Sequence, residues 1–165
     1  MITIQIEACK KEHSAAIAEI CATGWQQTVQ GLLSEEYQII AKEEWYNIER
    51  VQNEIEKGIY KYCAIVDDKI VGAIGGIITE DKISWVWVFY IDENYRYQGI
   101  GHKLLQQYTA DHRALGAQEQ WLTVLEGNMR AIPFYRSNKF QPVERILKRT
   151  KTNEDGIVWT YKRSI

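Results

Sequence analysis

Two glycines stand close together where a predicted strand gives way to a predicted helix. The strand ends near Ile91, and the chain then passes through Arg96-Tyr-Gln-Gly99-Ile-Gly101 before the helix begins. Glycine has no Cβ, so a ligand can approach the backbone closely there. Free N–H groups at the start of a helix, together with the positive end of its dipole, favour a bound anion. The segment therefore predicts an anion site, with phosphate as the expected ligand.

Two common phosphate-binding patterns do not fit this glycine segment. A dinucleotide fingerprint requires a third glycine at position 104, which is Leu104 here, and it follows the first strand of a parallel sheet. A P-loop requires Lys and then Ser or Thr directly after its last glycine, and this chain has His102 there. Taken alone, the two glycines would favour a simple tight turn between a strand and a helix.

The first third of the chain predicts a strand followed by two helices. Ile2, Ile4 and Ile6 alternate with polar residues, which is typical of a half-buried strand. Apolar residues at helical spacing predict a helix over residues 11–28. A second helix is predicted over 34–57, because Ser34 is a good N-cap followed by acidic residues and Gly58 is a helix stop.

The rest of the chain predicts three strands in a row and then alternating helices and strands. The three β-rich runs cover residues 60–66, 70–79 and 83–91, with short polar turns typical of an antiparallel meander. The later elements are predicted as a helix after Gly99 to Gly116, a strand over 120–125, a helix over 128–138, and strands over 140–148 and 157–162. This order, β-αα-βββ-α-β-α-ββ, predicts a mixed α/β fold with about seven strands and helices on both faces.

Length and composition predict one soluble domain over residues 1–165. The 165 residues are 45% hydrophobic and 25% charged, which is average for globular proteins. The net charge of −2 disfavours generic binding to nucleic acid or to an anionic membrane surface. The apolar runs are too short to span a bilayer and the N-terminus lacks a signal-peptide pattern, so we expect a cytoplasmic protein.

Cysteines and histidines predict neither a disulfide framework nor a metal site. The three cysteines are widely spaced and form no CxxC motif: Cys9, Cys21 and Cys63. The three histidines are equally scattered: His13, His102 and His112.

Charge is distributed unevenly along the chain. Residues 1–60 contain five basic and ten acidic side chains, a net charge of −5, and residues 61–165 contain fifteen and twelve, a net charge of +3. This asymmetry is compatible with a cationic ligand on one side and a phosphorylated one on the other. On charge alone, ordinary scatter of surface charge is the favoured explanation.

The glycine segment is accompanied by other motifs in a fixed order. It is preceded by Tyr90-Ile91-Asp92 and Tyr95-Arg96, and it is followed by Leu122-x-Val124, Asn128, Ala131, Phe134, Tyr135 and Phe140. The first helical region contains Gly24-Trp25, Gly31-Leu-Leu33 and Glu36-Tyr37. Together these motifs resemble the GNAT superfamily of coenzyme A-dependent N-acetyltransferases over essentially the whole chain. Arg96-x-x-Gly99-x-Gly101 is similar to that family's pyrophosphate loop.

The resemblance implies a role for each motif. The pyrophosphate of acetyl-CoA would be held near Arg96 by backbone N–H groups of Tyr97, Gln98, Gly99, Ile100, Gly101 and His102. The main chain of Phe89 and Ile91 would pair with the pantetheine arm, and the Phe89 N–H would polarise the thioester carbonyl. Asn128 would hydrogen-bond the arm from the other side, and Tyr135 would be the general acid on the departing sulfur.

The role of Tyr135 is also chemically reasonable. A thiolate whose conjugate acid has a pKa of about 8.5 leaves in this reaction, and a phenol with a pKa of about 10 can donate a proton to it. The alternative is that Phe134 and Tyr135 are only core aromatics of a short helix.

The chain departs from the family at the expected general base. Many relatives have a glutamate about four residues before the position of Phe89, where this chain has Trp85. Either water or an acid of the helical pair would then deprotonate the acceptor, and the candidates are Glu35, Glu36 and Glu44. Trp25, Trp85 and Trp87 could form an aromatic wall for the acceptor near Glu35, or they could pack in the core.

The resemblance implies an enzyme that transfers acetyl from acetyl-CoA directly to a primary amine of a small molecule or peptide, without a metal. The alternative is a catalytically weak module that keeps the GNAT fold and binds acyl-CoA or a protein partner. A homodimer is compatible with either function. The acceptor itself depends on loop and helix geometry that varies within one fold.

Overall fold

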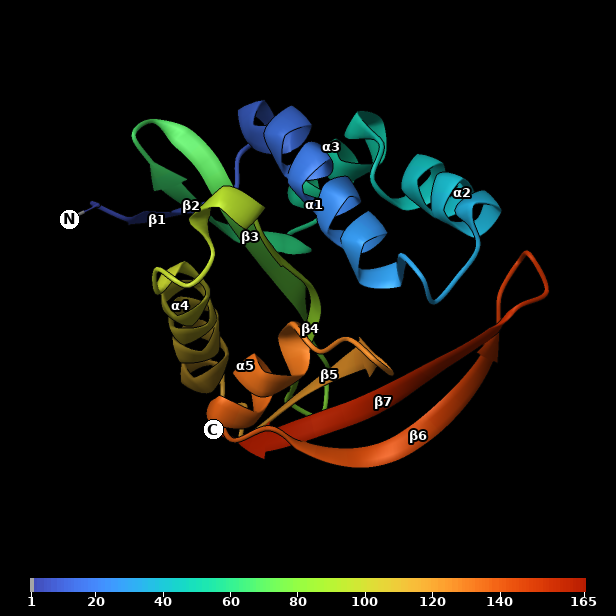
Figure 1. The fold of residues 1–165 in the computed structure, drawn as a ribbon. Helices are drawn as coiled ribbons and strands as arrows, with labels where there is room; N and C mark the ends of the chain where they lie inside the picture. The colour runs from blue at the N-terminus through green and yellow to red at the C-terminus, as the bar shows by residue number, and fades with distance from the viewer. Residues whose placement is uncertain (1) are drawn as a thin grey trace.

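The computed structural model describes residues 2–165, which form a seven-stranded sheet between two layers of helices (Figure 1). The strands are β1 (Gln5–Ala8), β2 (Tyr60–Val66), β3 (Lys69–Ile78), β4 (Ile83–Ile91), β5 (Glu119–Leu125), β6 (Gln141–Arg149) and β7 (Asp155–Ser164). The α-helices are α1 (Ser14–Val29), α2 (Glu35–Trp45), α3 (Ile48–Glu56), α4 (Ile100–Ala114) and α5 (Ala131–Ser137). Short 3-10 helices cover Lys11–His13 and Glu93–Tyr95. Among the described helices, none is long and apolar enough to cross a membrane.

The strands lie in the order β1-β2-β3-β4-β5-β7-β6, and only β4 and β5 pair in parallel. Helices α1, α2 and α3 lie on one side of the sheet, and α4 and α5 lie on the other (Figure 1). One buried core forms beneath α1 and α3 around Ile17, Val51 and Cys63. A larger core forms beneath α4 around Leu104 and Tyr108. The predicted mixed fold with helices on both faces is therefore confirmed.

The predicted helix over residues 34–57 is divided into two helices. α2 ends at Trp45, and Tyr46 leaves helical geometry with φ −122° and ψ 30°. Asn47 is extended, and its side chain accepts a hydrogen bond from Arg50 N at 2.8 Å, so it is the N-cap of α3. Three helices therefore separate β1 from β2, where two were predicted. The first strand is also displaced, since β1 covers Gln5–Ala8.

β4 and β5 pair over only four positions, from Ile83 opposite Glu119 to Val86 opposite Leu122. A buried polar network joins the strands at this paired end. Gln120 Nε2 donates to Ser84 Oγ at 3.2 Å, and Arg163 Nε donates to Gln120 Oε1 at 2.9 Å. Beyond Val86 the two parallel strands have no further paired residues, and a gap opens in the sheet.

A β-bulge lies where this gap begins. Val86 pairs with Gly76 and Val88 pairs with Gly75, so Trp87 is an extra residue on β4. The bulge changes which residues face each side of the sheet. Val86 packs in the core beneath α4, whereas Val88 packs against the core beneath α1. A Cβ on Gly76 would lie 2.0 Å from the carbonyl oxygen of Trp85, so only glycine fits opposite the bulge.

Candidate active site

The gap between β4 and β5 contains a cavity of about 520 Å³ that passes from one helical layer to the other. Its walls come from the second half of β4, the end of β5, the glycine loop, α1 and α5. Of the residues predicted for the site, those that line the cavity are Trp25, Trp87, Phe89, Ile91, Arg96, Tyr97, Gly99, Ile100, Gly101, His102, Asn128 and Tyr135. Segments more than 100 residues apart in the sequence thus meet around one opening.

The free edge of β4 presents main-chain groups to this cavity. Asp92 N donates to Val71 O of β3 at 2.8 Å, and Ile91 lies opposite Gly72 in the same ladder. Because N–H groups along a strand point alternately to its two sides, those of Phe89 and Ile91 face away from β3. On that side β5 has diverged, so these groups are available to pair with a ligand in an extended conformation.

The loop before α4 has the curled geometry of an anion-binding turn. Tyr97 has φ 62° and Gly99 has φ 86°, both in the left-handed region. Ile100, Gly101 and His102 begin α4, so their N–H groups have no partners within the helix. A Cβ on Gly101 would lie 3.5 Å from the ring of Phe134, and both residues line the cavity. Backbone donors therefore converge beside the cavity.

Gln98 is the member of the predicted loop that does not line the cavity. It is exposed, and its Nε2 donates to Asn94 O at 3.5 Å.

Arg96 is held at the mouth of the cavity by a residue of α1. Its NH2 donates to Gln27 Oε1 at 2.8 Å, and NH1 of Arg130 donates to the same oxygen at 3.1 Å. Gln27 Nε2 in turn donates to Glu93 Oε2 at 2.7 Å. Burial, and then the like charge of Arg130, lower the pKa of Arg96. Both arginines line the cavity and provide its positive charge.

Asn128 lies between β5 and α5, on the wall opposite β4. Its Oδ1 accepts a hydrogen bond from Ala131 N at 3.2 Å, and its carbonyl oxygen accepts one from Ile132 N at 3.1 Å. These bonds fix the side chain at the start of α5. The amide Nδ2 is a donor that can serve a ligand in the cavity.

Tyr135 comes from α5 and lies among other aromatic rings. Its ring centroid is 6.4 Å from that of Phe89 and 5.7 Å from that of Phe140. Burial raises the pKa of Tyr135, because an ionised phenol is unfavourable in this environment. Tyr135 therefore keeps its proton at neutral pH, and its hydroxyl group is a hydrogen-bond donor at the cavity wall.

Two tryptophans form the wall nearest α1, whereas two other residues predicted to lie near the acceptor, Trp85 and Glu35, are elsewhere. Trp25 and Trp87 line the cavity, and the ring centroid of Trp25 lies 5.6 Å from that of Trp45. Trp85 packs against Trp121 at 5.8 Å, outside the cavity. Glu35 is exposed in the first turn of α2 and also lies outside.

The close contact between α1 and β4 depends on Gly24. A Cβ on this residue would lie 2.4 Å from Cδ1 of Tyr90. The glycine allows α1 to approach β4 closely, which brings Trp25 to the cavity.

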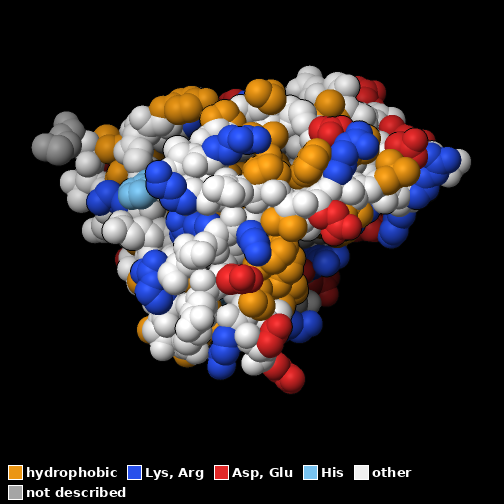
Figure 2. Space-filling view, turned by 90° about the horizontal axis from the view of Figure 1, so that it is seen from below, with side chains coloured by type: hydrophobic (Ala, Val, Ile, Leu, Met, Phe, Trp, Pro, Cys, Tyr) orange, Lys and Arg blue, Asp and Glu red, His pale blue; other side chains and the backbone are white. Residues whose placement is uncertain are grey.

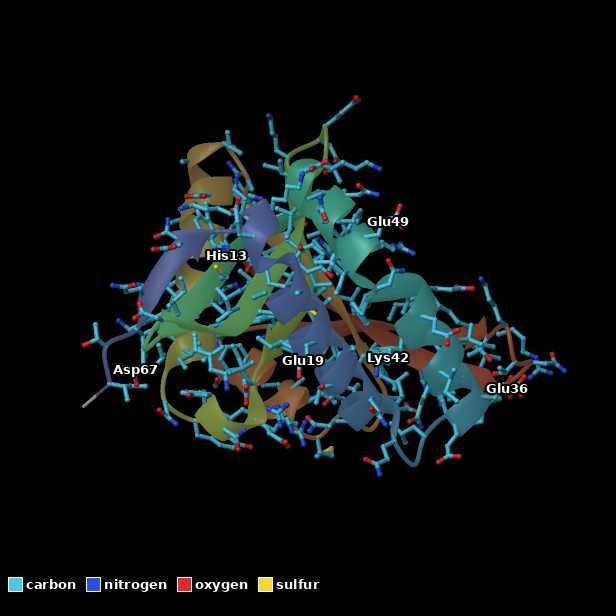
Figure 3. All side chains as sticks on the ribbon, turned by 90° about the horizontal axis from the view of Figure 1, so that it is seen from above. His13, Glu19, Glu36, Lys42, Glu49 and Asp67 are labelled. Atoms are coloured by element: carbon cyan, nitrogen blue, oxygen red, sulfur yellow. The ribbon has the colours of Figure 1, made fainter. Side chains whose placement is uncertain are left out.

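The acids considered as general bases do not line the cavity, and neither does any other Asp or Glu within residues 2–165. Glu44 pairs with Lys151 at 2.6 Å. Figure 3 shows Glu36 at the outer end of α2, where it is exposed. On the underside of the molecule, acidic and basic side chains are mixed around a strip of hydrophobic ones (Figure 2).

None of the three cysteines lines the cavity. Burial raises the pKa of Cys21 to about 12. Cys63 lies on β2, and its Sγ is 3.6 Å from Nδ1 of His13. The two residues are 50 positions apart in the sequence, so the sequence alone did not indicate this contact. This thiol is fully buried beneath α1 and α3.

We therefore expect the cysteines to be dispensable for chemistry. Replacing Cys9, Cys21 and Cys63 together with serine or alanine should leave kcat within a few fold, provided that circular dichroism shows a folded protein. Mass spectrometry of the wild-type protein after incubation with acetyl-CoA should show no acetylated cysteine. A trapped acetyl-cysteine peptide would contradict direct transfer.

Sequence reasoning missed Gln27 and Arg130 as site residues. Arg130 is two residues after Asn128, and this closeness to a motif residue could have indicated that Arg130 belongs to the site. Gln27 had no such signal, because it reaches Arg96 and Arg130 across 69 and 103 residues of sequence.

The sequence and the fold were compared with known proteins. The sequence matches the model of the acetyltransferase (GNAT) family over residues 24–140. No match was found among curated proteins. PaiA N-acetyltransferase from Thermoplasma acidophilum, solved in complex with coenzyme A, is 23% identical, with a TM-score of 0.79 over 99% of both chains.

Two further solved structures share the fold. A GCN5-related N-acetyltransferase from Rhodopseudomonas palustris is 16% identical, with a TM-score of 0.80 over 99% of this chain and 96% of that one. Ribosomal-protein-alanine N-acetyltransferase from Brucella melitensis is 19% identical, with a TM-score of 0.71 over 98% and 99%.

Proposed function

This chain belongs to the acetyltransferase (GNAT) family, and on that premise we propose that it transfers acetyl from acetyl-CoA directly to a primary amine of a small molecule or peptide. One observation carries the proposal. A single cavity joins the free edge of β4, the curled glycine loop, Asn128 and the protonated Tyr135. The edge of β4 would pair with the pantetheine arm, and the glycine loop would hold the pyrophosphate. Asn128 would hydrogen-bond an amide of the arm, and Tyr135 would lie at the sulfur.

In the proposed reaction, the nitrogen of a neutral amine attacks the thioester carbonyl carbon. The carbonyl oxygen becomes an oxyanion, which a fixed backbone N–H such as that of Phe89 stabilises. The C–S bond then breaks, and the phenol of Tyr135 gives its proton to the departing sulfur. The proton lost by the amine passes to water and restores Tyr135, so the products are an amide and free CoA.

The proposal is tested by release of free thiol from acetyl-CoA in the presence of candidate amines. The panel contains polyamines, amino acids, aminoglycosides and peptides, with an alanine-initiated peptide included because of the Brucella relative. The control omits the acceptor and measures hydrolysis. Acceptor-dependent thiol release with a matching acetylated product supports the enzyme. Tight CoA binding without turnover across the panel would favour the binding module instead.

We propose that the acceptor enters beside Trp25 and Trp87, on the side of α1. Residues 1–60, which include this helix, have a net charge of −5, with five basic and ten acidic side chains. Aromatic faces also attract cations. Cationic amines should therefore give a higher kcat/KM than amines of similar size that carry carboxylates. A panel in which only carboxylate-rich acceptors turn over would contradict this placement.

A further inference from the structure

We propose that Gln27 is a positioning residue, which holds Arg96 and Arg130 together as a pair of guanidinium groups for a phosphate of the cofactor. The inference rests on the proposed acetyl-CoA site and adds two residues to it. Gln27 reaches the site from α1, on the opposite side of the sheet from α4 and α5 (Figure 1).

The hydrogen bonds show how Gln27 joins the two edges of the cavity. Arg96 follows β4 and Arg130 precedes α5, so the two residues belong to opposite walls. Both donate to the single Oε1 atom of Gln27, at 2.8 and 3.1 Å. Glu93 fixes the amide from its other end, by accepting from Nε2 at 2.7 Å. The amide therefore has one orientation, with its oxygen toward the arginines.

The charges make this arrangement suited to an anion. Two guanidinium groups converge on a neutral oxygen, and the one carboxylate in the network, Glu93, bonds the amide rather than either arginine. Convergence of like charges is unfavourable unless an anion compensates it. Both arginines line the cavity, beside the glycine loop that offers backbone N–H groups. A phosphate bound there would be met by guanidinium donors and main-chain donors together.

The first experiment tests Gln27 by comparing Gln27→Met with the control variant Gln26→Met. Methionine keeps the length and helix propensity of glutamine but removes the amide, and Gln26 is an exposed neighbour on the same helix. Calorimetric titration should give CoA a Kd roughly 10-fold higher for Gln27→Met, as expected for loss of charge-assisted hydrogen bonds. Gln26→Met should bind as the wild type does. Pantetheine, which has no phosphate, should bind all three proteins equally.

A second pair of variants tests the arginine itself. Arg130 is exposed, so Arg130→Met should fold, and Arg136→Met on α5 is its control. Arg130→Met should weaken CoA binding roughly 10-fold, and Arg136→Met should not. Titration with 3′-dephospho-CoA identifies the phosphate. If Arg130→Met also binds 3′-dephospho-CoA more weakly than the wild type does, the arginines bind the pyrophosphate. If the two proteins bind 3′-dephospho-CoA equally, the arginines bind the 3′-phosphate.

The outcomes separate this inference from the proposed function. Wild-type protein that does not bind CoA would overturn the proposed function. Wild-type binding with unchanged affinity in Gln27→Met or in Arg130→Met would overturn the inference alone. Equal weakening of pantetheine and CoA by Gln27→Met would also overturn it, because that result indicates general damage to the cavity.

Discussion

Replacing Tyr135 with phenylalanine should lower kcat by roughly 10- to 1000-fold, the range expected for losing one general acid. The substitution removes only the hydroxyl group, so the ring keeps its contacts with Phe89 and Phe140. CoA affinity should barely change, because the glycine loop is untouched. The measurement is steady-state turnover with the best acceptor, together with calorimetric titration of CoA.

The matched control is Tyr161→Phe. Tyr161 is a buried tyrosine of the same core and does not line the cavity, so its loss tests the general effect of removing a buried hydroxyl group. It should leave kcat nearly unchanged.

Since burial raises the pKa of Tyr135, the wild-type enzyme should also keep its activity as pH approaches the usual phenol value of about 10. Full activity in Tyr135→Phe would show that another group, or water, protonates the sulfur.

Replacing Gly101 with valine should weaken CoA binding by about 5- to 150-fold, since overpacking a filled site typically costs about 1–3 kcal/mol. The new Cβ would contact Phe134 at 3.5 Å, an ordinary distance, while the methyl groups occupy space needed by the ligand. Gly101 is in the first turn of α4, where valine is compatible with the backbone. Calorimetric titration of the folded variant with CoA measures the effect.

Gly99 is a poorer probe of the same site. Its φ of 86° is left-handed, so Gly99→Val would strain the loop as well as obstruct the ligand. The control for Gly101→Val is Gln106→Val, an exposed position further along α4. It should bind CoA as the wild type does. Unchanged affinity in Gly101→Val would place the pyrophosphate away from the loop.

Local patterns predicted most of the elements because the causes of those elements are local. The three meander runs, the helix after Gly99 and the strand ending at Leu125 all follow from periodicity and turn residues close in sequence. The division between α2 and α3 had a local signal too. Asn47 followed by Glu49 is a typical helix start, but the apolar pattern on either side appeared continuous.

The bulge at Trp87 shows where alternation fails. Strict alternation puts Trp85 and Trp87 on the same face, so both were expected either in one aromatic wall or together in the core. An extra residue on β4 disrupts that alternation, and Trp87 lines the cavity while Trp85 packs on Trp121. The bulge depends on the pairing of β4 with Gly75 and Gly76 of β3, so β4 alone does not reveal it.

By itself, the sequence determined the order of elements apart from the division between α2 and α3, the glycine loop that begins α4, and the family motif that includes Asn128 and Tyr135, since each depends on residues near one another in the chain. The tertiary structure alone decided where β4 and β5 separate, which tryptophans line the cavity, and that Gln27 joins Arg96 to Arg130. The physical reason is that these features arise from contacts between distant segments, whose partners are set by how the helices and strands pack rather than by spacing along the chain.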